Sequence, residues 1–155
     1  MNMRAIPIYA EGFLIDMTAA QAIMRAYGLD PDEDADPNFP FILHEDILLE
    51  TAGVLNNEGI ECFYCSDFCG DAACPPDVLE YLGIYDKKGV KDTFENEIVL
   101  MIPLDRASEL TRQSYTSVDE IVSEIKTKLK QFLQHFPEDY SFEKNIRVLL
   151  GTTYC

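Results

Sequence analysis

The cysteines are the residues whose spacing most nearly resembles that of a chemical site. Four thiolates that converge in a tetrahedron bind zinc, and such a site contributes directly to folding free energy. Zinc ribbons, however, use two C-x2-C pairs separated by a longer stretch. Buried structural thiols, or disulfide and redox chemistry, are the alternatives. Zinc is therefore the one cofactor to test, and its ligands would be the cysteines of the spacing C-x2-C-x3-C-x4-C, namely Cys62, Cys65, Cys69 and Cys74.

Carboxylates alternate along residues 30–36, as oxygen ligands do at the start of a calcium-binding loop. The sixth position from Asp30 is Ala35, where such a loop requires glycine for its turn. The twelfth position is Phe41, where a bidentate glutamate would close the site. We therefore expect a solvated acidic loop here and no built calcium site.

Catalytic signatures are absent from the sequence. The chain has no glycine-rich phosphate loop, no G-x-S-x-G and no H-E-x-x-H. Its two histidines, His44 and His135, are interpreted as structural or surface residues. The sequence predicts no catalytic residue, although an enzyme with an unrecognised carboxylate site remains an alternative.

Charge is distributed very unevenly along the chain. The whole sequence has 12 basic and 28 acidic residues, a net charge of -16. Residues 1–86 hold 2 basic and 17 acidic residues, whereas residues 87–155 hold 10 and 11. An acidic surface repels phosphate backbones, because nucleic-acid binding depends on Lys and Arg. The chain is thus not expected to bind nucleic acid directly.

We expect the acidic part to dock on a basic protein, since opposite charge speeds association at low salt. Solubility is the alternative reason for such a composition. In composition alone, the chain resembles the acidic inhibitors of mobile elements, the anti-CRISPR and antirestriction proteins, which implies competition with nucleic acid for a protein surface. The expected contact residues are Asp30, Asp32, Glu33, Asp34, Asp36, Glu45, Asp46, Glu50, Glu58 and Glu61.

In the acidic part, apolar patterns predict one or two strands within residues 4–16 and a strand over residues 60–64. A capping box of Thr18 and Gln21 predicts a helix over residues 19–27. A second helix is expected over residues 45–55. Residues 77–82 are interpreted as a short helix, because they follow two prolines and precede a glycine.

In the near-neutral part, residues 97–104 form a near-continuous apolar run, typical of a strand buried on both faces. Ser117 and Glu120 form a capping box before the most strongly amphipathic helix, and residues 146–153 follow as a strand. This order predicts a C-terminal β-α-β unit with a parallel strand pair.

These elements together predict one α+β (mixed α/β) domain over residues 1–155. We expect a three- to five-stranded mixed sheet with three to four helices packed on it. The longest apolar runs have five or six residues, whereas a membrane span needs roughly 20. No secretory signal is expected at the N-terminus, so the predicted location is cytoplasmic and away from the membrane.

Overall fold

The computed structural model of the chain describes residues 5–29, 41, 45–66, 78–92, 98–104 and 117–154. Within these ranges it has five strands and three α-helices, with two short 3-10 helices before the last strand. The elements in chain order are β1 (Ala5–Leu14), α1 (Met17–Arg25), α2 (Glu45–Asn57), β2 (Phe63–Ser66), β3 (Val78–Tyr85), β4 (Ile98–Pro103), α3 (Val118–Lys128), η1 (Lys130–His135), η2 (Phe142–Asn145) and β5 (Ile146–Tyr154).

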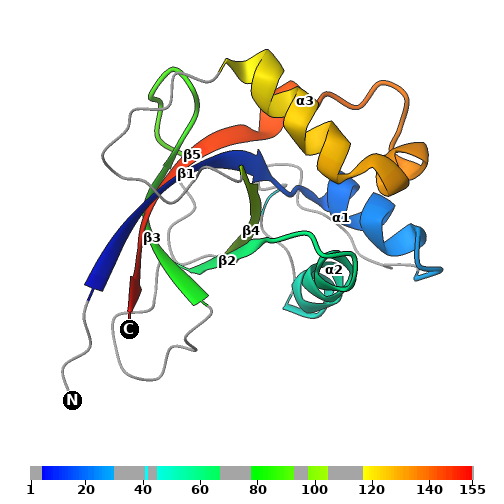
Figure 1. Ribbon diagram of the computed structural model, residues 1–155, viewed down its shortest axis with the longest axis horizontal. Helices are drawn as coiled ribbons and strands as arrows, with labels where there is room; N and C mark the ends of the chain where they lie inside the picture. The colour runs from blue at the N-terminus through cyan, green and yellow to red at the C-terminus, as the bar shows by residue number, and fades with distance from the viewer. Residues whose placement is uncertain are drawn as a thin grey trace.

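The strands close into a barrel in the order β1-β4-β2-β3-β5. β2 and β3 are parallel, and every other neighbouring pair is antiparallel. Figure 1 shows the α-helices gathered toward one side of this barrel, above and to the right of the strands. The arrangement confirms the predicted α+β class and the mixed sheet.

Strand β4 is buried on both faces, as its continuous apolar sequence predicts. Val99 and Met101 point into the barrel interior, where they pack with residues such as Leu149. Leu100 and Ile102, which alternate with them, pack in the second cluster under the helices. A strand between two apolar clusters needs no polar face, and this explains why the run has no alternation.

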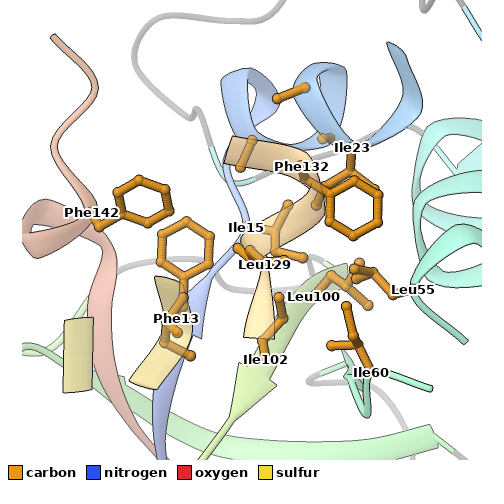
Figure 2. Close-up of a cluster of buried hydrophobic side chains, with 14 of the residues drawn as sticks. Phe13, Ile15, Ile23, Leu55, Ile60, Leu100, Ile102, Leu129, Phe132 and Phe142 are labelled. Carbon is orange, nitrogen blue, oxygen red and sulfur yellow. The ribbon is translucent and has the colours of Figure 1, made fainter. Parts of the chain in front are cut away.

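The larger apolar cluster lies between the strands and the helices. Figure 2 shows Leu100 of β4 facing side chains from separate helical elements, among them Ile23, Leu55 and Phe132. The apolar stripe of α3 continues past the end of the α-helix into η1, where Phe132 is fully buried. The long amphipathic pattern therefore ends in a 3-10 turn that keeps the same face on the core.

The start of α3 confirms the sequence prediction, whereas the start of α1 does not. The Ser117 side chain accepts a hydrogen bond from the backbone N–H of Glu120, at 3.2 Å. For α1 the cap is Asp16, not Thr18, because Met17 already belongs to the helix. The Asp16 side chain accepts a hydrogen bond from the backbone N–H of Ala19, at 2.8 Å, and so satisfies one of the free N–H groups at the start of the helix.

The Asp16 carboxylate also joins α1 to the segment that precedes β5. It accepts hydrogen bonds from the Tyr140 hydroxyl at 3.0 Å and from the Asn145 amide at 2.9 Å. The same Asn145 nitrogen lies 2.7 Å from the Tyr140 oxygen. Burial, followed by the charge of Asp16, raises the pKa of Tyr140, so this phenol stays a hydrogen-bond donor. One carboxylate thus links residues more than a hundred positions apart.

The helix predicted over residues 77–82 is wrong, because residues 78–82 belong to β3. It pairs in parallel with β2 and antiparallel with β5. Gly83 does not end a helix: the register shifts between Tyr81 and Gly83, and the Tyr85 ring lies where a side chain at position 83 would be. Tertiary pairing has overridden the local helix signal.

The C-terminal β-α-β order is present, but its two strands are not neighbours. β4 and β5 both pair antiparallel with β1, so they run in the same direction. β1 lies between them in the barrel. The expected direct parallel pair is therefore replaced by two antiparallel pairs with a shared partner.

Gly12 is required where β1 passes β4. It lies opposite Pro103, and a Cβ atom at position 12 would be 2.2 Å from the carbonyl oxygen of Ile102. Backbone atoms cannot yield as a flexible side chain can. A side chain here would therefore separate the two strands.

We predict that Gly12→Ala lowers the free energy of unfolding by about 1–3 kcal/mol, because overpacking forces the backbone to shift. Urea denaturation followed by circular dichroism measures the change. Gly53→Ala is the matched control: Gly53 is helical, with nothing within 4 Å of an added Cβ, and this substitution should raise stability by about 0.5–1 kcal/mol. Equal effects of the two substitutions would contradict the close approach at Gly12.

Candidate functional site

The exposed side of α2 combines acidic residues with one leucine. Asp46, Leu49, Glu50 and Gly53 are all exposed, and their spacing of three and four residues places them on one face of the helix. Leu49 has 55% of its side-chain surface exposed, although it stands in the middle of the helix. The opposite side is buried in the core through Ile47, Leu48, Thr51, Val54 and Leu55.

The part of the sequence that contains α2 has acidic residues and no basic ones. Residues 45–66 contain five carboxylates and no Lys or Arg. Lys87 pairs with Glu11 and Arg147 pairs with Asp92, and neither of these ion pairs uses a carboxylate of α2. The exposed face of α2 is therefore negative without compensation from an ion pair of the described chain.

Glu58 differs from the other expected contact residues, because it holds two helical segments together. The Tyr27 hydroxyl at the end of α1 donates a hydrogen bond to its carboxylate. Hydrogen bonds from Tyr27 and Gln131 lower the pKa of Glu58. The hydrogen bond between Tyr27 and Glu58 also raises the pKa of Tyr27. Glu61, three residues further on, is exposed.

Half of the expected contact residues cannot be placed relative to this face. Asp30, Asp32, Glu33, Asp34 and Asp36 lie outside the described residues. Glu45 begins α2, and Asp46 and Glu50 lie on its exposed side. A contiguous patch that also includes residues 30–36 stays a prediction.

The two described cysteines pack in different apolar clusters. Cys65 lies fully buried inside the barrel, whereas Cys62 packs against the cluster under the helices. Cys62 comes just before β2 and Cys65 lies within it, and the charge of Cys62 adds to burial in raising the pKa of Cys65. Cys69 and Cys74 lie outside the described residues, and the four-thiolate zinc site stays a prediction.

Both described thiols are held in the protonated form. Burial, followed by the charge of Glu61, raises the pKa of Cys62 to about 11. Burial also raises the pKa of Cys65. Thiolates, not thiols, bind metal and react as nucleophiles. In the described chain these two residues behave as small apolar side chains, one of the alternatives that the sequence leaves open.

His135 is the histidine that the structure describes. His135 ends η1, half-buried, and its Nε2 lies 3.3 Å from the amide nitrogen of Gln134. His44 lies outside the described residues. No group of three or more His, Cys, Asp or Glu side chains that could hold a metal ion occurs among the described residues.

A buried carboxylate that the sequence analysis did not single out lies on β1. Glu11 is only 2% exposed, and its Oε1 accepts hydrogen bonds from Lys87 at 2.9 Å and from the Tyr9 hydroxyl at 3.2 Å. Its Oε2 is buried with no hydrogen-bond partner among the described residues. Burial, followed by the charge of Glu11, raises the pKa of Tyr9. The ion pair between Glu11 and Lys87 holds the turn after β3 against β1.

One signal in the sequence could have revealed Glu11. It is the single charged residue in the strand from Ala5 to Leu14. A charge in an otherwise apolar strand is buried at a high cost unless it has a partner. The partner, Lys87, is 76 residues away, and no local pattern connects the two.

Comparisons with known proteins identify no relative of this chain. No family model matches it, and neither the curated proteins nor the solved structures contain a match. Among the described residues, no helix combines the length and the apolar character that a membrane crossing requires. The residues and their geometry are therefore the only basis for a functional proposal.

We predict that Lys87→Met lowers the free energy of unfolding by about 3 kcal/mol, because it leaves a buried carboxylate without its cation. The double variant Glu11→Leu/Lys87→Met should lose less than the single variant, since it removes both charges. Denaturant unfolding of both proteins measures this difference. Lys88→Met, at an exposed lysine of the same turn, is the control and should change little. A double variant no more stable than Lys87→Met would refute this account.

We also predict slow alkylation of Cys62 in the folded protein. A pKa of about 11 in place of 9.0 lowers the thiolate fraction about a hundredfold at pH 8. Iodoacetamide labelling, read peptide by peptide in a mass spectrometer, compares the native chain with the chain in urea. The native rate should rise as pH increases toward 11. A native rate equal to the unfolded rate would show that the thiol is accessible and ionised.

Proposed function

We propose that this chain is a non-catalytic acidic binding module that docks on a basic protein surface through the exposed face of α2. The observation that carries the proposal is the composition of that face. It combines Asp46 and Glu50 with an exposed leucine, in a region from residue 45 to residue 66 that lacks any cation. Exposed carboxylates around an apolar side chain fit a partner with lysines or arginines around an apolar spot.

The packing of α2 supports a rigid docking surface. Its buried side is anchored in the core by Leu48 and Leu55, both fully buried. The hydrogen bond between Tyr27 and Glu58 ties its C-terminal end to α1. A partner would therefore meet side chains on a fixed helix, and little backbone freedom would be lost on binding.

Competition with nucleic acid follows from the sign of the charge. A protein surface that binds phosphates is rich in Lys and Arg, and the same cations attract carboxylates. An acidic module on that surface excludes the nucleic acid both by occupying it and by repelling phosphates. The proposed role is thus that of an inhibitor or regulator of a nucleic-acid-binding protein.

We predict that the chain binds core histones, a probe with basic nucleic-acid-binding surfaces, and that DNA competes for the complex. Titration calorimetry at several salt concentrations measures this, and affinity should fall as salt screens the charges. Lysozyme, a basic enzyme of similar size, tests whether charge alone is enough. Absence of histone binding at low salt, or binding that is indifferent to salt, would end the proposal.

Two charge-reversal variants locate the contact. Asp46→Lys/Glu50→Lys should weaken histone binding at least about tenfold, since close charge pairs across interfaces couple by several kcal/mol. Glu138→Lys/Asp139→Lys is the matched control: both residues are exposed, lie between η1 and η2, and change the net charge by the same amount. Equal losses in the two variants would assign the effect to net charge and not to α2.

A further inference from the structure

The two most exposed large apolar side chains of the described residues lie beside charges of opposite sign. Val90 is 62% exposed and lies in the turn after β3, next to the exposed Lys88 and Lys91. Leu49 is 55% exposed and lies on α2 beside Asp46 and Glu50. Each patch thus combines one aliphatic side chain with two like charges, and these charges differ in sign between the patches; the turn also holds the Asp86 carboxylate, which accepts backbone hydrogen bonds from Lys88 and Val90.

The α2 patch has one position without a side chain next to its leucine, and we call this position the notch. Gly53 lies one helical turn after Leu49, is exposed, and has no neighbouring atom within 4 Å of where a Cβ would stand. Its φ angle is not positive, so the fold does not need glycine there. Glycine within a helix is less stable than alanine. Glycine at position 53 therefore costs helix stability, and the missing side chain leaves room for another chain to approach the helix closely.

The turn after β3 is built as a rigid projection. The Asp86 side chain accepts hydrogen bonds from the backbone N–H groups of Lys88 and Val90, each at 2.9 Å. Gly89 adopts φ +87, which glycine alone adopts readily. Lys87 anchors the base of the turn to Glu11. The tip therefore presents Val90 and its lysines on a backbone of fixed conformation, with little backbone entropy left to lose.

We propose that the turn of residues 86–91 in one copy of this chain docks on the α2 face of a second copy, with Val90 in the notch at Gly53 beside Leu49. Lys88 and Lys91 then meet Asp46 and Glu50. In Figure 1 the turn after β3 and α2 lie at opposite sides of the molecule, so one copy cannot make this contact with itself. The contact uses two different surfaces and is heterologous, so in a pair one copy retains a free α2 face and the other a free turn.

This inference rests on the proposed function, because it also treats the α2 face as a docking surface for basic groups. Here the basic groups are the lysines of a second copy of the chain. Self-association through a turn and part of a helix buries a small area, and interfaces below about 1,200 Å² are weak and transient. At an ionic strength of about 0.15 M, charges more than about 8 Å apart are largely screened, so local complementarity outweighs the net negative charge. Copies of the chain would occupy the α2 face until a stronger basic partner displaces them.

Sedimentation velocity at constant ionic strength, at protein concentrations up to about 1 mM, tests the contact, since interfaces of this size are weak. The wild type should sediment faster as concentration rises. Asp46→Lys/Glu50→Lys and Lys88→Glu/Lys91→Glu should each stay monomeric, because both patches of each variant then have the same sign. An equimolar mixture of these two variants should associate again, since every contact between unlike variants pairs opposite charges. A wild type that stays monomeric, or a mixture that does not associate, would overturn the proposal.

Matched controls separate this contact from effects of net charge. Glu138→Lys/Asp139→Lys and Lys130→Glu/Lys144→Glu change the net charge by the same amounts at exposed residues elsewhere. They should associate as the wild type does, and an equal loss of association in them would overturn the assignment to these patches.

Gly53→Ala tests the notch itself, because it keeps every charge and favours the helix. It should weaken self-association at least about tenfold, as a side chain in the notch holds the valine away. An unchanged association constant would overturn the docking geometry. Histone binding remains a separate readout: a monomeric wild type that binds histones refutes only self-association, whereas self-association without histone binding refutes only the basic-protein partner.

Discussion

The carboxylate of Asp16 holds the start of α1 to the segment that precedes β5. It closes the N-terminus of α1 and receives the hydroxyl of Tyr140 and the amide of Asn145. The rings of Phe13 and Phe136 lie 6.5 Å and 5.0 Å from the ring of Tyr140, so the network borders the aromatic part of the core. Hydrogen bonds in such surroundings are strong, and losing one partner would leave the others unsatisfied.

Carboxylates serve two separate purposes in this chain. Asp16 and Glu11 point inward and join segments that are distant in sequence, each through donors that satisfy it at least in part. Asp46 and Glu50 point outward from α2, where the described chain offers them no ion pair. The acidic excess is thus partly architectural, and only its outward share is available for a partner.

The elements that the sequence predicted well are those whose signals are local. Ser117 begins a helix because its own side chain caps it, and residues 98–103 form a strand because an apolar run needs burial on both faces. The misassigned elements depend on distant partners. β3 is a strand only because β2 and β5 flank it, and the buried role of Glu11 requires Lys87. For the candidate site, composition indicated an acidic surface, and the helix predicted over residues 45–55 already places Leu49 and Gly53 on one face with Asp46; the fold adds that this face is the exposed one.

The pairing of β1 with β5 has a consequence for how the chain folds. These strands are aligned from Ala5 with Tyr154 to Phe13 with Ile146, so the first strand finds its partner in the last. Contacts of such long range slow folding, because a large loop must close before they form. During synthesis, β1 emerges from the ribosome long before β5 exists, and its backbone groups that face β5 must remain unpaired until β5 has been translated.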